Sequence, residues 1–328
     1  MVRLLLNQLK GFTCNTSSVA LAPRPQQLRN TLLELITPIS TPVRPYICKT
    51  TGRILIPEHV LFLTNLHGEC AFKSSCDKYS KGIGDKHVIE AILSSCGACT
   101  MPGDSAVLDI GSNVGQFSAM MRAMGCSVIA VDPQVEVNRF FNMMVLANNW
   151  DVDGSILHFP AYLGSSDGTV HVNRTLWAPG ERRMKYNQTA QQMAVKRLVN
   201  RNFLFVKIDI DGPEGIVLRE LALLIPQFTL GNIMVEVEIS SWSKYFSISD
   251  DEAVEIFHRY YDLNYHPYLT YLDSLVGVPE VEQLNVTPKL GYLENVAYIP
   301  RDRLRAVLFS KNKFTKNIFL GLGNEWSA

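Results

Sequence analysis

Short apolar runs recur along this chain, and alternating polar residues do not break them. Two such runs, Ala106 to Ile110 and Ser127 to Val131, flank a glycine turn and a segment with apolar residues at helical spacing. An unbroken apolar run is typical of a parallel strand that is covered on both faces. A strand, a helix and a strand within about 25 residues predict a right-handed crossover, which is the unit of a doubly wound α/β sheet.

The same signals continue on both sides of this unit. Further strands are expected at 155–159, 203–210, 231–237, 295–299 and 305–309. Helices are expected at 86–95, 135–149 and 250–261, the last with Ser249 or Asp250 as its cap, and another should follow Pro213 and end near Leu224. Upstream, the apolar runs at 53–56 and 60–63 predict a short strand or hairpin that caps the main sheet.

The stretch after the third core strand has a different character. A short strand is expected at 169–172, and residues 173–190 are polar, with Trp177, Arg182 and Arg183 among them. A polar insertion of this length between core elements is typical of a lid or of a disordered loop. Both interpretations stay open from the sequence.

Residues 1–45 form an N-terminal extension that differs in composition from the rest. Arg3, Lys10, Arg24 and Arg29 all precede the first acid, Glu34, and prolines are frequent. This composition is typical of an organelle transit peptide, and it fits a disordered extension equally well. The sequence therefore predicts a soluble protein, either cytoplasmic or directed to an organelle, with its folded part in residues 46–328.

Bulk composition excludes some classes of protein. The formal net charge is zero, which disfavours a dedicated nucleic-acid binder, and 47% of the residues are hydrophobic, enough for a large core. No apolar run approaches the roughly 18 residues of a membrane span. The seven cysteines predict ordinary thiols rather than a disulfide framework; Cys96 and Cys99 have CxxC spacing, so a redox pair, or a zinc site with Cys70 and Cys76, is an alternative.

The end of the first core strand carries the strongest ligand signal, in Asp109, Gly111, Ser112, Asn113 and Gly115. In an open parallel sheet, a ligand binds beyond the carboxyl ends of the strands, where the strand order reverses. The turn reads Gly-x-x-x-Gly rather than GxGxxG, and an acid precedes it. A carboxylate there would repel a pyrophosphate but attract a cationic ligand. This combination favours S-adenosylmethionine, which carries an ammonium and a sulfonium group.

A second acid, Asp132, ends the second strand 23 residues after Asp109, and Pro133 follows it. An acid in this place can accept hydrogen bonds from both ribose hydroxyls, as it also does in dehydrogenases. Ala161 and Tyr162 follow the third strand, where an adenine ring is expected to lie. The alternative is a flavodoxin-like or dehydrogenase-like sheet that carries these acids by chance.

These motifs resemble the FkbM family of S-adenosylmethionine-dependent methyltransferases. The similarity covers roughly residues 86–311. It is carried by VLDIGSNVGQFS at 107–118, the Asp132–Pro133 pair, LANN at 146–149, the turn at 164–169, VKIDIDGPE at 206–214 and VLFSK at 307–311. The segment at 206–214 resembles the family signature Lys-Ile-Asp-Val-Glu-Gly-Ala-Glu. Two departures are Asp211 in place of Glu and Pro213 in place of Ala.

The resemblance implies a mostly parallel seven-stranded sheet with a reversed last strand, in one domain at 46–328 with its core at 86–311. It also implies S-adenosylmethionine as cofactor and, usually, methylation of a hydroxyl oxygen. A hydroxyl acceptor benefits from a general base.

Asp209, Asp211 and Glu214 are the predicted catalytic acids, at the end of the fourth core strand. Asp209 is the first candidate for the base because it directly follows a buried strand. Asp211 and Glu214 could instead cap the next helix. Asp209 and Asp211 could also hold a divalent cation, although no third ligand is evident. Lys207, in the same strand, could pair with one of these acids.

The leading prediction is an O-methyltransferase that acts on a small-molecule or glycan acceptor. An RNA or protein methyltransferase is an alternative, which the neutral charge and the lack of an Asn-Pro-Pro-Tyr motif disfavour for RNA. A non-catalytic S-adenosylmethionine-binding protein of the same fold is the other. The intact Asp109, Gly111, Gly115 and Asp132 disfavour it, because a lost activity would place no demand on them.

Overall fold

The structure is a computed structural model that describes residues 43–48, 59–64, 106–151, 154–178, 182–271, 274–277, 305–311 and 318–319. The elements predicted at 53–56, 86–95 and 295–299 lie outside these residues. β1 (Val43–Cys48) and β2 (His59–Thr64) pair antiparallel in a small sheet of their own. β2 contains the apolar run at 60–63, so the strand predicted there is confirmed.

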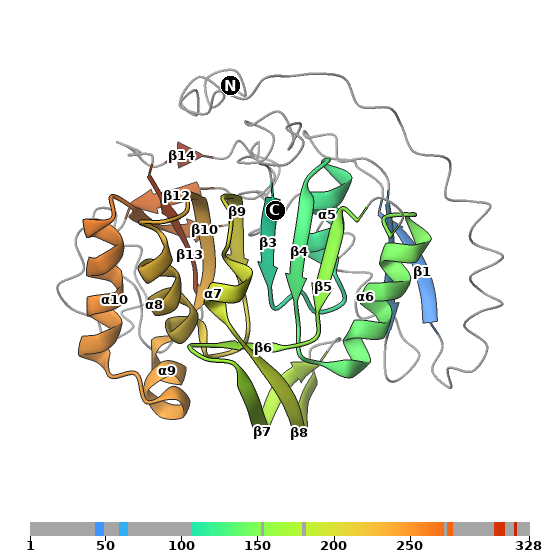
Figure 1. Ribbon diagram of the computed structural model, residues 1–328, viewed down its shortest axis with the longest axis horizontal. Helices are drawn as coiled ribbons and strands as arrows, with labels where there is room; N and C mark the ends of the chain where they lie inside the picture. The colour runs from blue at the N-terminus through green and yellow to red at the C-terminus, as the bar shows by residue number, and fades with distance from the viewer. Residues whose placement is uncertain are drawn as a thin grey trace, which may run out of the picture.

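The main sheet has nine described strands in the order β14-β12-β11-β13-β10-β9-β3-β4-β5 (Figure 1). Five of them run parallel: β3 (Ala106–Ile110), β4 (Ser127–Val131), β5 (Ile156–Phe159), β9 (Phe203–Ile208) and β10 (Leu230–Val237). The chain builds β3, β4 and β5 in one direction and then places β9 and β10 on the other side of β3. The strand order therefore reverses between β3 and β9, as in a doubly wound sheet.

The reversed strand is β13 (Arg305–Ser310), which pairs antiparallel with both β10 and β11 (His266–Tyr271). The seven strands from β5 to β11 thus form the predicted mostly parallel sheet of the methyltransferase Rossmann-like class. β12 (Ser274–Gly277) and β14 (Ile318–Phe319) extend its edge. The sequence did not predict β11, because Pro267 lies inside it and proline normally argues against a strand interior.

The described helices are α5 (Gln116–Ala123), α6 (Val135–Ala147), α7 (Val195–Leu198), α8 (Glu214–Leu224), α9 (Ile239–Phe246) and α10 (Asp250–Asp262). Four of them, α5, α6, α8 and α10, were predicted from the sequence, whereas α7 and α9 were not. In Figure 1, α8, α9 and α10 gather beside β10, and α6 lies beyond β5. The Ser249 hydroxyl accepts a hydrogen bond from the Glu252 N–H at 3.1 Å, which confirms Ser249 as the cap of α10. Pro213 is the N-cap residue of α8 rather than part of its first turn.

Large aromatic side chains fill the core beside α8, α9 and α10. Trp242, Phe257, Tyr260 and Phe309 are fully buried, and the rings of Tyr260 and Phe309 lie 4.5 Å apart. The Tyr260 hydroxyl donates to the Leu218 carbonyl at 3.0 Å, so its burial leaves no unsatisfied donor. The sheet is therefore anchored at the side of β10 and β13 by a dense aromatic layer.

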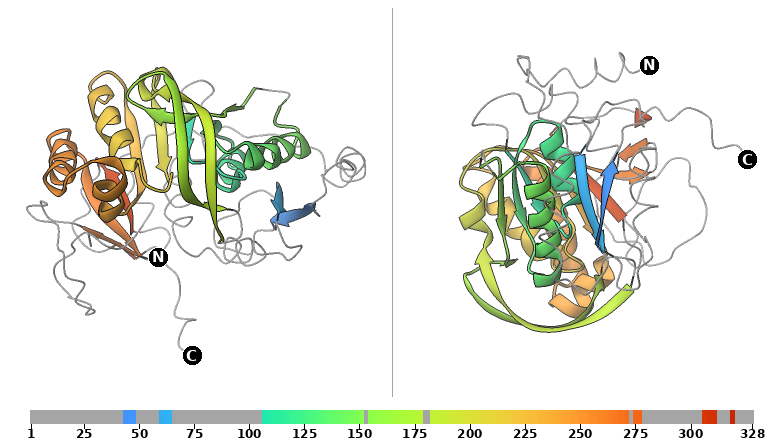
Figure 2. Two further views of the ribbon diagram at one scale, coloured as in Figure 1. Left: turned by 90° about the horizontal axis from the view of Figure 1, so that it is seen from below. Right: turned by 90° about the vertical axis from the view of Figure 1, so that its right-hand side faces the viewer.

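A long hairpin replaces the irregular segment predicted at 173–190. β7 (Gly168–Ala178) pairs antiparallel over its whole length with residues 182–192 of β8 (Arg182–Ala194), and β6 (Tyr162–Gly164) pairs parallel with the end of β8. Figure 2 shows this ribbon curving away from the main sheet. The prediction of an irregular segment was wrong because two strands can bond through their backbones without an apolar pattern.

Cys126 also differs from its prediction. This residue is fully buried just before β4, and it is disulfide-bonded, so the expectation of ordinary thiols is wrong for it. Cys70, Cys76, Cys96 and Cys99 lie outside the described residues. None of the helices in the described part of the chain has the length and apolar character of a membrane span.

Candidate functional site

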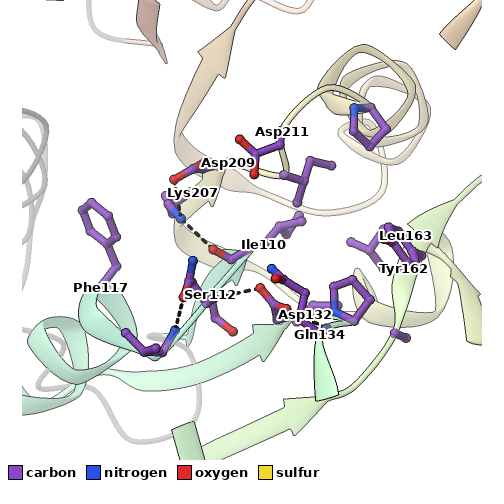
Figure 3. A pocket seen from close by; sticks show the side chains of 18 of the residues that line it. Ile110, Ser112, Phe117, Asp132, Gln134, Tyr162, Leu163, Lys207, Asp209 and Asp211 are labelled. Atoms are coloured by element: carbon purple, nitrogen blue, oxygen red, sulfur yellow. Dashed lines mark hydrogen bonds and ion pairs between the residues drawn. The ribbon is translucent and has the colours of Figure 1, made fainter. Parts of the chain in front are cut away.

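A pocket opens at the carboxyl ends of β3, β4 and β9, where the strand order reverses. Its lining comes from four segments of the chain, within 110–117, 131–134, 161–163 and 207–213. Figure 3 shows Tyr162 and Leu163 on the opposite side of this pocket from Lys207 and Asp209. Among the predicted cofactor residues, those that line it are Gly111, Ser112, Asn113, Asp132, Pro133, Ala161 and Tyr162. Asp109 and Gly115 do not.

Gly111 brings the turn after β3 against the chain that follows β9. Its φ is +79°, and a Cβ at this position would lie 1.6 Å from the carbonyl oxygen of Asp209. No L side chain fits there, so both the backbone angle and the packing require glycine. The N–H groups of Gly111 and Ser112 donate to the Val131 carbonyl at 2.8 and 3.1 Å. The turn is therefore fixed to β4 and to Asp209 at once.

Gly115 has a different neighbourhood. Its φ is +89°, and a Cβ there would lie 2.5 Å from Met144 Cε and 2.8 Å from Phe141 Cδ2 on α6. The glycine precedes α5 and allows that helix to approach α6 closely. In the described structure, Gly115 thus packs two helices together instead of facing the pocket.

Asp132 is the buried acid of the pocket, with 2% of its surface exposed. One carboxylate oxygen accepts from the Asn113 N–H at 2.9 Å, and the other accepts from the Gln134 N–H at 2.9 Å. Burial raises the pKa of Asp132 to about 6, although these hydrogen bonds oppose the rise. Each oxygen keeps a further lone pair, so the carboxylate can accept two more donors from a ligand.

Asp109 is fully buried, and its charge is matched inside the protein. Its Oδ2 accepts from the Ser118 hydroxyl at 2.6 Å, and its Oδ1 lies 3.5 Å from the Lys207 ammonium. The sequence led us to expect that this acid would meet the ligand directly. The described structure instead places it against Lys207 and the start of α5.

Asp209 and Asp211 both line the pocket. The Asp209 side chain is 32% exposed, and its Oδ2 lies 3.2 Å from the Lys207 ammonium. Asp211 is exposed and has a φ of +56°, an uncommon conformation for a residue with a side chain. Two carboxylates therefore stand at the part of the pocket that β9 supplies.

Glu214 lies behind the turn that carries these two acids, and it does not line the pocket. It is 3% exposed, and its Oε1 accepts from the N–H groups of Ile210 at 3.2 Å and Gly212 at 2.7 Å. Its Oε2 accepts from the Trp242 indole at 3.0 Å. Burial raises the pKa of Glu214 to about 7. The carboxylate thus fastens the turn to α9.

Lys207 lines the pocket and was not among the predicted site residues, although its pairing with an acid was expected. Its ammonium donates to the Gly111 carbonyl at 2.9 Å and lies 4.8 Å from the centre of the Phe117 ring. Burial alone would lower the pKa of Lys207, but the carboxylates of Asp209, Asp109 and Glu236 outweigh it and raise the pKa. The signal in the sequence was a lysine within an otherwise apolar strand.

Three buried polar atoms of lining residues make no hydrogen bond within the described structure. They are the Ser112 hydroxyl, Nε2 of Gln116 and Oε1 of Gln134. Buried polar groups normally have partners, so unpaired ones in a pocket indicate contacts that a ligand would make. This set offers both donors and acceptors, as a nucleoside and an amino acid would require.

The remaining candidates lie elsewhere. Trp177 and Arg183 are opposite each other in the β7–β8 ladder, and Arg182 is opposite Ala178. Within the described residues, no group of three or more His, Cys, Asp or Glu side chains is arranged to hold a metal ion.

Comparison with known proteins gives similarities only among solved structures. No protein-family model matches the chain, and no curated protein matches it. The methyltransferase FkbM from Methylobacillus flagellatus KT is 12% identical, with 73% of this chain and 57% of that chain covered and a TM-score of 0.38. The chain therefore spans less than two thirds of that protein.

Two further solved structures have similar scores. The precorrin-6y C5,15-methyltransferase from Geobacter metallireducens is 11% identical over 69% of this chain and 88% of that chain, with a TM-score of 0.33. The fibrillarin pre-rRNA processing protein of Methanococcus jannaschii is 10% identical over 83% of this chain and 98% of that chain, with a TM-score of 0.35. The fold assignment rests on the order and direction of the strands, and membership of the FkbM family stays a prediction.

Proposed function

We propose that this protein is an S-adenosylmethionine-dependent methyltransferase that methylates a hydroxyl oxygen of a small molecule or glycan. The charge of the pocket carries this proposal. The described lining contains three carboxylates, of Asp132, Asp209 and Asp211, and one ammonium, which already pairs with Asp209 and Asp109. Such a pocket repels the phosphates of a dinucleotide and attracts a cationic cofactor.

The residues present fit the nucleoside part of this cofactor. Asp132 would accept the ribose hydroxyls with the lone pairs that its backbone partners leave free. Ala161, Tyr162 and Leu163 supply an apolar wall for the adenine ring. The unpaired Ser112 hydroxyl and the side-chain amide oxygen of Gln134 supply further polar contacts. The turn at Gly111 would hold the amino-acid end.

Asp209 is the group that we assign to the acceptor. When bound, the cofactor supplies an electrophilic methyl group, and the protein has to align the acceptor with it. Asp209 is partly exposed at the pocket and fixed to the cofactor turn through Gly111. Its carboxylate would accept the proton of the acceptor hydroxyl as the oxygen attacks. Asp211, exposed two residues later, would bind a second polar group of the acceptor.

Glu214 takes a supporting part in this proposal. Its carboxylate accepts three hydrogen bonds from protein N–H groups and has no access to the pocket lining. We therefore assign it to holding the turn between β9 and α8 in place. The catalytic prediction for Glu214 becomes a positioning role.

Calorimetry with S-adenosylmethionine and its demethylated product, S-adenosylhomocysteine, tests the cofactor. Binding of both is expected, and no heat with either would sink the proposal. Incubation with methyl-labelled cofactor and fractionated cell extract then tests the acceptor. Label in small molecules or glycans supports the proposal, and label confined to RNA or protein would contradict the acceptor class. Binding without any transfer would favour a non-catalytic cofactor-binding protein.

A further inference from the structure

Lys207 holds an unusual position for a lysine, because its ammonium is buried where the two turns of the pocket meet. Its side chain is 4% exposed. The ammonium donates to the Gly111 carbonyl at 2.9 Å and lies 3.2 Å from the Asp209 carboxylate. The first partner belongs to the turn that we assign to the cofactor, and the second is the proposed base.

The surroundings of this ammonium keep it charged and fixed. Besides Asp209, the Asp109 carboxylate lies 3.5 Å from it, and the Phe117 ring lies 4.8 Å away. A buried ammonium is costly unless it is paired and hydrogen-bonded, and here both conditions are met. Lys207 is therefore protonated in the folded protein and is not itself a candidate for the base.

The backbone couples the same two turns independently. The Asp209 N–H donates to the Ile110 carbonyl at 3.0 Å, and the Asp209 carbonyl lies where a side chain of residue 111 would be. These backbone contacts fix the main chain of Asp209, but they do not fix the orientation of its side-chain carboxylate. Among the described groups, only the Lys207 ammonium bonds both to the cofactor turn and to that carboxylate.

We propose that Lys207 is a positioning residue that holds the Gly111 turn and the Asp209 carboxylate in one fixed arrangement, so that the cofactor site and the base are set together. This inference rests on the proposed function. It predicts that loss of the ammonium impairs cofactor binding and transfer at the same time, whereas loss of the Asp209 charge impairs transfer alone.

The first test is calorimetry of the full chain with S-adenosylhomocysteine. Lys207→Met should weaken the affinity at least about tenfold, since a charged hydrogen bond to the cofactor turn is lost. Asp209→Asn should change it less than about threefold. Arg219→Met is the matched control. It removes a cation that does not line the pocket and that lies 2.7 Å from the Glu252 carboxylate, so the affinity should stay unchanged. Unchanged affinity of Lys207→Met would overturn the inference.

The second test uses transfer of label to the extract fraction that accepts it, with saturating cofactor. Lys207→Met should slow turnover about as much as Asp209→Asn. The double variant of Lys207→Met with Asp209→Asn should be no slower than the slower of the two single variants. Additive losses would leave Lys207 with a purely structural role.

Folding is controlled separately. Lys207→Met leaves the buried Asp109 carboxylate without its cation, so the variant could fail to fold. The double variant Lys207→Met with Asp109→Asn removes that charge. Its affinity for S-adenosylhomocysteine should be weaker than that of Asp109→Asn alone by the same factor that separates Lys207→Met from the unmodified protein. If the unmodified protein binds neither cofactor form, the methyltransferase proposal fails. If it binds and the lysine variants bind equally well, only the role of Lys207 fails.

Discussion

Asp132 and Glu214 are two buried carboxylates, and only the first of them lines the pocket. Burial raises the pKa of both, to about 6 for Asp132 and to about 7 for Glu214. Backbone N–H groups donate to both. Asp132 lines the pocket and keeps lone pairs for a ligand, whereas Glu214 also accepts the Trp242 indole and is enclosed by its own turn.

Burial and backbone hydrogen bonds are thus common to both acids, and contact with the pocket distinguishes Asp132 from Glu214. Asp132 accepts two hydrogen bonds from the protein and faces the pocket with its other lone pairs. Glu214 accepts three hydrogen bonds from the protein and does not line the pocket. Mutations should therefore separate them cleanly: Glu214 variants should lose stability, and Asp132 variants should lose binding.

The largest effect is expected from Glu214→Ala. Its loss leaves the N–H groups of Ile210 and Gly212 and the Trp242 indole without their acceptor. Each unsatisfied buried donor costs about 1–3 kcal/mol, so the loss of an acceptor for three donors should lower the free energy of unfolding by about 3–9 kcal/mol. Urea denaturation measures this change. Glu214→Gln keeps one acceptor oxygen and should lose less, and a fully stable Glu214→Ala would remove the contrast with Asp132.

The pH dependence of stability should separate the two acids next. The folded protein keeps a proton on each at pH values where the unfolded chain, with ordinary pKa values of 3.8 for Asp132 and 4.5 for Glu214, releases it. The free energy of unfolding should therefore fall as the pH rises, from 3.8 to about 6 for Asp132 and from 4.5 to about 7 for Glu214. The fall is at most about 3 kcal/mol for one group.

Urea denaturation at a series of pH values from 4 to about 8 tests this dependence. Glu214→Gln should remove the upper part of the fall, and Asp132→Asn should remove the lower part. Saturating S-adenosylhomocysteine should flatten only the part that belongs to Asp132, because its ribose would stabilise the ionised form. A stability that rises between pH 5 and about 7 would contradict the assignment of both groups.

Asp132→Asn should mainly affect binding. An amide replaces one acceptor oxygen with a donor, so at least one ribose hydroxyl loses its partner. The affinity for S-adenosylhomocysteine should fall about 10- to 100-fold, or about 2 kcal/mol. Asp251→Asn, at an exposed position of α10, is the matched control for calorimetry. Equal affinities of the two variants would place the ribose elsewhere.

The smallest effect concerns Gly115, which packs α5 against α6 without lining the pocket. Gly115→Ala should cost about 1 kcal/mol or somewhat more, for the positive φ and for the contact with Phe141 and Met144. Gly154→Ala is the control, because its φ is +63° and nothing lies within 4 Å of the added carbon. Both variants should bind S-adenosylhomocysteine normally. A loss of affinity confined to Gly115→Ala would assign this glycine to the pocket after all.

The sequence predicted the elements in which burial dictates composition. β3 and β4 were predicted because strands covered on both faces must be apolar, and all five residues of β3 are buried. Gly111 was singled out as part of the Gly-x-x-x-Gly turn, and in the structure only glycine fits there. Of the β7–β8 hairpin, only the short strand at 169–172 was predicted, and it lies within β7. The rest was missed because its strands are joined through backbone hydrogen bonds that leave no trace in hydrophobicity.

Within the site, residue types were predicted better than their orientations. Asp209 and Glu214 lie five residues apart and carry the same group, but only the fold decides which carboxylate faces the pocket. Likewise, Asp109 and Asp132 both end central strands, and Lys207 takes up the charge of the first. That pairing joins residues 98 positions apart in the chain, and only the alignment of β3 with β9 brings them together.

The β7–β8 ladder also defines where the molecule can be redesigned. Its pairs run without interruption from Gly168 opposite Gln192 to Ala178 opposite Arg182, and β6 is its only other partner among the described strands. Removing matched pairs from the tip shortens this arm without shifting the register of what remains. The hairpin is thus a natural place to graft a foreign loop or a reporter while the nine-stranded sheet stays intact.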